Sequence, residues 1–134
     1  MMKKFIFSAF VAATMSPAIS AACTFNFHVY GDSSIRDRIK VEIGNKITDE
    51  YCLKYNKKYE IVILVSSYAS SNLALGHAVV GLRKKGTKDV PAKNHQGYWT
   101  KQGNHAIGVA HDMAASIALD YVADVMSDIP SYIN

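Results

Sequence analysis

The feature that most constrains the fold is a run of five apolar residues, Ile61 to Val65, four of which are β-branched. Such residues favour strands, and an apolar run without alternation is typical of a strand covered on both faces. Glu60 precedes the run, and two serines follow it. We therefore expect a strand over 60–68 at the centre of a sheet.

The N-terminus has the pattern of a secretory signal peptide. Lys3 and Lys4 form a positive start, an apolar segment covers 5–15, and small residues follow at 18–22. The apolar segment is shorter than the roughly 20 residues that a membrane-spanning helix needs. We expect residues 1–21 to be a bacterial signal peptide and the protein to be exported, to the periplasm or as a secreted protein.

The position at which the signal peptide is cleaved determines whether Cys23 can form a disulfide or is lipidated. Cleavage after Ala21, which we expect, leaves a single domain over 22–134 with two cysteines, Cys23 and Cys52. An even number of cysteines in an exported chain favours a disulfide. Closing this loop of about thirty residues would stabilise the fold by roughly 3 kcal/mol. Cleavage after Ala22 would instead leave Cys23 as a lipidated N-terminus that anchors the protein to a membrane.

Hydrophobic periodicity predicts five elements. Alternation indicates a strand over 23–30, and apolar residues at every fourth position indicate a helix over 34–55. A short turn joins the strand at 60–68 to one at 73–83, which predicts an antiparallel hairpin, and a last helix covers 105–127. The order β-α-β-β-α predicts a small single α+β domain. In it, an antiparallel sheet of three to four strands carries two helices, and one disulfide ties the first strand to the first helix.

Small residues predict where another element comes close. One face of the strand at 73–83 presents Ala74, Gly76 and Ala78, so we expect a helix to lie close against it. Gly44 lies inside the first predicted helix, where glycine costs about 1 kcal/mol relative to alanine. We expect another backbone to approach it.

The charge distribution points to a binding segment. Loss of Lys3 and Lys4 lowers the net charge from +4 to +2, yet 83–101 carries a local +5, which leaves −3 for the rest of the mature chain. Apart from a candidate short strand at 98–100, this region has no regular period, and its basic residues are interleaved with aromatic residues that often anchor interfaces. We expect a loop over 84–101 that binds a partner through Lys84, Lys85, Lys88, Lys93, His95, Tyr98, Trp99 and Lys101. The alternative is a solvated lysine loop with the tryptophan in the core.

Motifs for catalysis or metal binding are weak. The sequence has no nucleophile elbow and no glycine-rich phosphate loop. His105 and His111 are six residues apart, not the three or four that bring two ligands onto one helical turn. His111 falls on an apolar helix face, as expected of a core residue. We expect no catalytic residue, no cofactor and no metal; the alternative is a small envelope hydrolase or metal-dependent enzyme that uses His95, His105, His111 and Asp112.

Elimination then predicts an exported, non-catalytic binding protein, most simply a periplasmic inhibitor or immunity-type protein. Its partner would be a protein or an anionic component of the envelope. Nucleic acid is not expected, because a mature charge of +2 is far from the basic footprint of nucleic-acid binders. A further alternative is a structural component of a surface or secretion apparatus. There, an acidic line on the last helix, Asp120, Asp124 and Asp128, would contact another subunit.

Overall fold

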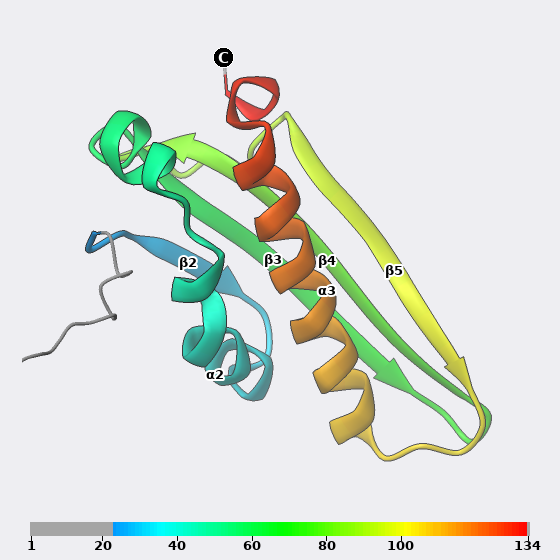
Figure 1. The fold of residues 1–134 in the computed structure, drawn as a ribbon. Helices are drawn as coiled ribbons and strands as arrows, with labels where there is room; N and C mark the ends of the chain where they lie inside the picture. Colours follow the sequence, from blue (N-terminus) through cyan, green and yellow to red (C-terminus); the bar gives the residue numbers. More distant parts are fainter. Residues whose placement is uncertain (1–22, 134) are drawn as a thin grey trace, which may run out of the picture.

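The computed structural model describes residues 23–133, so the predicted signal peptide at 1–21 lies outside the described residues. Four strands form one sheet in the order β2-β3-β4-β5, and helices α2 and α3 both cover the same face of it (Figure 1). This arrangement confirms the α+β class. The elements are β2 (Phe27–Tyr30), α2 (Ser33–Glu42), β3 (Tyr59–Ala69), β4 (Leu73–Lys84), β5 (Asn94–Gln102) and α3 (Ile107–Ser127), with short helical turns η1 (Ile43–Lys46), η2 (Tyr51–Tyr55) and η3 (Ile129–Tyr132).

The sheet is mixed, whereas the sequence led us to expect an antiparallel one. β3, β4 and β5 are antiparallel to their neighbours, but β2 runs parallel to β3. The cause is the helical connection between β2 and β3, which returns the chain to the end of the sheet where β2 began. Parallel neighbours need such a crossover, and a hairpin turn could not provide it.

The central strand is β3, and the apolar run at its core is buried as expected. Ile61, Ile63 and Val65 face the helices and are at most 6% exposed. Val62, on the other face, is 1% exposed although no described helix covers that face. The chain after β4 reaches this face next to it: Pro91 Cβ lies 2.7 Å from where a Cβ of Gly81 would be, and Gly81 is directly opposite Val62.

The predicted close approach of a helix to the small-residue face of β4 is confirmed. A Cβ atom on Gly76 would lie 2.5 Å from the backbone nitrogen of Ala114 in α3. Ala74, Ala78 and Ala110 are fully buried around this contact. The helix can therefore lie close to the sheet only while β4 presents no side chain at Gly76.

The first predicted helix is interrupted. α2 ends at Glu42, a 3-10 turn follows, and after a break the chain forms the short helical turn η2. A stripe with a period of four drifts around one straight helix, and the break lets Ile43 and Tyr51 both turn into the core. The expectation for Gly44 was wrong, since nothing lies within 4 Å of where its Cβ would be.

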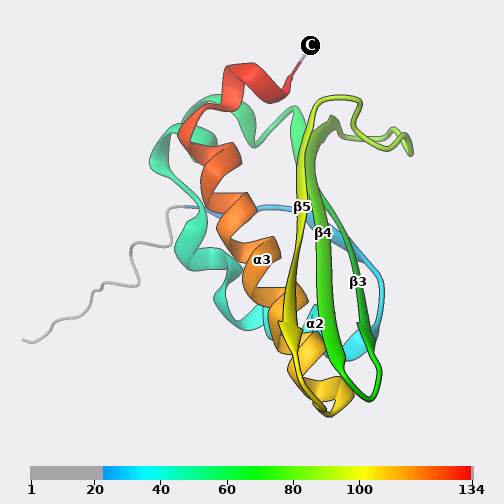
Figure 2. The same ribbon diagram turned by 90° about the vertical axis from the view of Figure 1, so that its right-hand side faces the viewer.

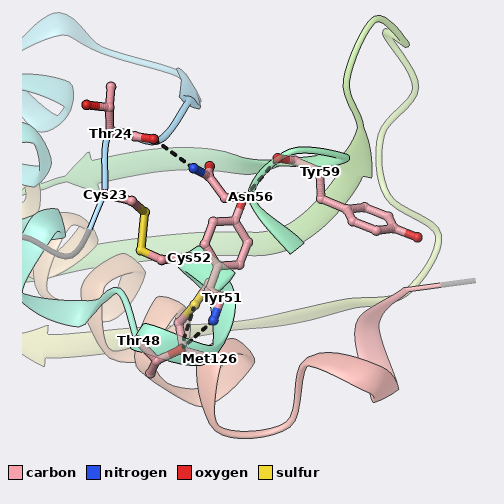
Figure 3. Close-up of a disulfide and its surroundings, with 8 residues drawn as sticks. All are labelled: Cys23, Thr24, Thr48, Tyr51, Cys52, Asn56, Tyr59 and Met126. Carbon is pink, nitrogen blue, oxygen red and sulfur yellow. Dashed lines mark hydrogen bonds between the residues drawn. A yellow bond between two sulfur atoms is a disulfide. The ribbon is translucent and has the colours of Figure 1, made fainter. Parts of the chain in front are cut away.

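The predicted disulfide joins Cys23 and Cys52 across a Cα–Cα distance of 5.7 Å (Figure 3). Next to it, the Asn56 side chain donates a hydrogen bond to the Thr24 carbonyl oxygen at 2.8 Å. The Tyr51 hydroxyl, which is buried, donates to the Tyr59 carbonyl oxygen at 3.0 Å. Together these contacts hold the segment before β2 against η2 and the start of β3.

Replacing Gly76 by alanine tests the close contact between α3 and β4. The new methyl group would overlap the α3 backbone, so we expect the free energy of unfolding to fall by about 1–3 kcal/mol. Gly108→Ala in α3 is the matched control, because a Cβ there meets nothing within 4 Å. Urea denaturation measures both, and equal stability of the two variants would contradict the contact.

Candidate functional site

The predicted binding segment does not form one loop. Lys84 is the last residue of β4, only 85–93 is an irregular connection, and 94–101 belongs to the edge strand β5. Lys93 lies just before β5 and Lys101 near its end, roughly 27 Å apart at 3.4 Å per residue. The eight expected contact residues are therefore spread over the end of β4, the connection and the whole length of β5.

The two aromatic residues of the segment point to opposite faces of the sheet. Trp99 is directly opposite Gly76 and lies on the helix side, whereas Tyr98 is opposite His77 on the other side. Trp99 is 43% exposed and Tyr98 is 64% exposed, so neither belongs to the core. They cannot anchor the same flat contact, because side chains of successive residues in a strand alternate between its faces.

His95 is held by the helix side of the fold. Its Nδ1 lies 3.3 Å from the Tyr132 hydroxyl oxygen and its Nε2 lies 3.3 Å from a carboxylate oxygen of Asp124. The ring also packs edge-on against Tyr121, with centroids 4.2 Å apart. These contacts position His95 as part of the junction between β5, α3 and the C-terminal turn.

Lys84 and Lys85, the first lysines of the segment, lie next to a second lysine pair, Lys57 and Lys58. This second pair was not among the predicted contact residues. The backbone N–H of Lys85 donates a hydrogen bond to the carbonyl oxygen of Lys58 at 2.9 Å, which joins the chain after β4 to the turn before β3. We call the resulting surface the lysine end. It consists of Lys57, Lys58, Lys84, Lys85 and Lys88, all exposed and none in an ion pair within 23–133.

The chain around the lysine end is a tight turn. Gly86 has a φ of 87°, which favours glycine. The Thr87 hydroxyl donates to the Lys84 carbonyl oxygen at 2.7 Å and fixes the turn. Figure 2 shows the connection after β4 projecting from one end of the sheet. Asp89 is the one acid within 83–93, so the local field is strongly positive.

Arg83, which contributed to the predicted positive charge, is neutralised. It is 8% exposed, and its Nε donates to a carboxylate oxygen of Glu60 at 2.7 Å. Its Nη2 donates to the Tyr30 hydroxyl at 3.1 Å, and His28 Nε2 lies 3.4 Å from the same Glu60 oxygen. Burial alone would raise the pKa of Glu60, but the hydrogen bond from Arg83, with the charges of His28 and Arg83, holds that pKa below its usual range.

A hollow of about 300 Å³ opens beside the lysine end. The connection after β4 forms one wall of it, and the C-terminal residues form another. Its lining combines apolar and basic groups, among them Tyr59, Leu82, Pro91, Ile133, Lys84 and Lys93. Such a hollow can accept an apolar side chain while the lysines at its rim bind a neighbouring negative charge.

The fold does not bring together the histidines of the alternative enzyme hypothesis. His95 lies beside Asp124, whereas His111 is thirteen residues earlier in the same helix, roughly 20 Å away along its axis. His105 contacts the Gln102 carbonyl oxygen at 2.8 Å, and Asp112 accepts from Arg38 at 2.9 Å. Across 23–133, no group of three or more histidine, cysteine, aspartate or glutamate side chains could hold a metal ion.

A serine, a histidine and an aspartate do come close together elsewhere, but their contacts link elements of the fold and do not form a catalytic triad. The Ser67 hydroxyl lies 2.9 Å from His111 Nδ1, and the Asp32 carboxylate lies 3.9 Å from Nε2, beyond hydrogen-bond reach. Asp32 already accepts the Ser34 backbone N–H at 2.7 Å as the cap of α2, and this bond lowers its pKa. The histidine is thus a satisfied, mostly buried residue that links β3 and α3.

Comparison with known proteins adds no functional information. No family model matches the chain, and no curated protein is significantly similar to it. In the part of the chain described here, no helix has both the length and the apolar character needed to cross a membrane. The disulfide is compatible with an exported protein.

The buried pair of Glu60 and Arg83 generates a stability prediction. Glu60→Gln leaves the arginine unpaired, so we expect a loss of about 3 kcal/mol in the free energy of unfolding. The double variant E60L/R83M removes both charges and should stay within about 1 kcal/mol of the wild type. Urea denaturation near neutral pH checks both values. A double variant as unstable as the single one would contradict the ion-pair account.

The same pair predicts a pH dependence. The folded state holds the pKa of Glu60 below the unfolded value of about 4.3. Its contribution is therefore complete above that pH and is lost as the pH falls through the folded pKa. We expect the wild type to lose more stability than E60L/R83M between about pH 6 and about pH 3. Parallel losses in urea titrations at the two pH values would exclude a role for the pair.

Proposed function

We propose that this chain is an exported, non-catalytic binding protein, of the periplasmic inhibitor or immunity type, that binds an acidic protein partner through the lysine end. The observation that carries the proposal is the backbone hydrogen bond from Lys85 to Lys58, which brings two lysine pairs distant in the sequence side by side at one end of the sheet. Five exposed lysines held by two turns would attract an anionic surface and steer its approach.

The buried ion pair between Glu60 and Arg83, next to the lysine end along β3 and β4, supports this role. Because Glu60 pairs with Arg83, its negative charge does not neutralise the exposed lysines. Their positive charge therefore remains free to bind a partner. The turns that carry them are anchored on β3 and β4, the two longest strands of the sheet. A rigid base lowers the conformational entropy that a binding surface loses on association.

The hollow beside the lysine end makes the proposal more specific. Purely electrostatic contacts at an exposed surface contribute little affinity, whereas a side chain inserted into a pocket can act as an anchor. We propose that the partner presents an apolar or aromatic side chain next to its carboxylates. The side chain would enter the hollow between Tyr59, Pro91 and Ile133, which line it.

A charge-reversal pair tests the proposed surface. K58E/K84E changes one lysine in each turn, and K40E/K46E makes the same change of net charge on α2 and η1, away from the lysine end. Immobilised protein would be incubated with an envelope extract, and mass spectrometry would identify what each variant retains. We expect wild type and K40E/K46E to retain the same acidic protein and K58E/K84E to lose it. Circular dichroism would verify that all three are folded.

A third variant separates the contribution of the hollow to partner binding from the contribution of the lysine charges. Ala92→Trp adds an uncharged bulky group to the lining of the hollow and should weaken capture while every lysine remains. If K58E/K84E retains its partner, or if K40E/K46E loses it equally, the lysine end is not the binding surface.

A further inference from the structure

The outer edge of β5 is the largest unused hydrogen-bonding surface of the described fold. β5 pairs with β4 on one side and with no described strand on the other. Figure 2 looks toward this edge and shows no element crossing in front of it. The outward backbone groups of this nine-residue strand, Asn94–Gln102, therefore face solvent.

The register of the β4–β5 hairpin tells which backbone groups are unused. The Gly103 N–H donates to the Asn72 carbonyl oxygen at 2.9 Å, so this opposite pair is hydrogen-bonded. In an antiparallel ladder such pairs alternate with non-hydrogen-bonded ones. The odd-numbered residues of β5 therefore bond to β4. The N–H and C=O groups that point outward belong to Asn94, Gln96, Tyr98, Thr100 and Gln102.

β5 also lacks the devices that usually protect an edge. Edge strands are commonly blocked by proline, by charged residues, by a bulge or by a covering element. β5 contains no proline, and its only lysine, Lys101, lies one residue from its end. Its pairing with β4 is continuous from Asn94 to Gln102 without a bulge.

We infer that two copies of this chain pair through β5, edge to edge and antiparallel, about a two-fold axis at Tyr98. Among the pairings that match outward groups with outward groups, only this register uses all nine residues, because it places Asn94 opposite Gln102 and Gln96 opposite Thr100. The same patch then faces itself, as an isologous dimer requires. The product is a continuous sheet of eight strands.

The side chains complement one another in this register on the helix side. Lys101 of one copy lies opposite His95 of the other, and His95 is already 3.3 Å from the Asp124 carboxylate. Lysine and aspartate are both exposed, so a cross-strand ion pair forms twice, once on each side of the axis. Opposite charges across paired strands stabilise the pairing, and like charges oppose it.

The aromatic residues also find partners. Trp99 lies opposite Gly97, where a Cβ would overlap the Tyr121 hydroxyl in α3. The exposed indole can therefore pack beside that tyrosine of the second copy. On the other face Tyr98 meets its own counterpart as a cross-strand aromatic pair.

The helices leave room for this arrangement. α3 makes most of its strand contacts with β4 rather than with β5. Strands β4 of the two copies would be three strand spacings apart, roughly 14 Å, more than the 8–10 Å between helices in direct contact. The gap accommodates the side chains of β5 on that face. An unrelated extended peptide could also bond to the edge, but it would not supply the two-fold charge and aromatic pairs.

Light scattering on a concentration series of the disulfide-bonded protein tests the dimer. We expect the wild type to dimerise. Thr100→Pro should raise the dissociation constant about tenfold or more, because it removes an outward N–H that β4 does not use. Thr100→Val is the matched control. K101E should weaken the dimer similarly, and K101E/D124K should restore it by exchanging the charges.

Cysteine cross-linking tests the register independently. In a pairing centred on Tyr98, the two Tyr98 Cα atoms are about 5.5 Å apart, within disulfide range. Tyr98→Cys should therefore form covalent dimers on mild oxidation. Gln96→Cys should not, because its own counterpart lies roughly 14 Å away. A wild type that stays monomeric at every concentration, or equal cross-linking of the two cysteine variants, would overturn the proposal.

Discussion

The close contact between α3 and β4 is the constraint on which the rest of the structure depends. Only small residues, above all Gly76, allow the helix backbone to reach the sheet. Because α3 lies so low over β4, its flank also reaches β5, where Tyr121 covers Gly97 and Asp124 meets His95. A helix held further away would leave β5 with β4 as its only support. Both proposed binding surfaces, the lysine end at the end of β4 and the outer edge of β5, thus depend on the contact between α3 and β4. That contact itself contains no functional group.

Features with a strong local signal could be predicted from the sequence. The apolar run of β3, the hairpin to β4 and the small-residue face of β4 follow from side-chain periodicity. The bridge between Cys23 and Cys52 follows from an even cysteine count and from the lengths of the elements between them. The parallel pairing of β2 with β3 was missed because the periodicity of a strand carries no information on its direction.

The predictions failed where the determinant is a tertiary contact. β5 has no hydrophobic alternation, because its helix side presents His95, Gly97, Trp99 and Lys101. These residues are recognisable as one face of a strand only when α3 packs over them. The lysine end has no contiguous signal either, because its two turns are joined by the hydrogen bond between Lys85 and Lys58. Charge counted along the chain also included Arg83, which Glu60 neutralises in the folded protein.

The lysine end and the edge of β5 occupy different parts of one sheet, and this separation has a consequence. Antiparallel pairing about Tyr98 reverses the second sheet, so the two lysine ends would lie at opposite ends of the dimer. Nine strand residues alone place them roughly 30 Å apart. A partner with two anionic regions at that spacing would engage both ends and gain from effective concentration. Dimerisation would then raise avidity without altering a contact at either lysine end, because the two surfaces share no residue.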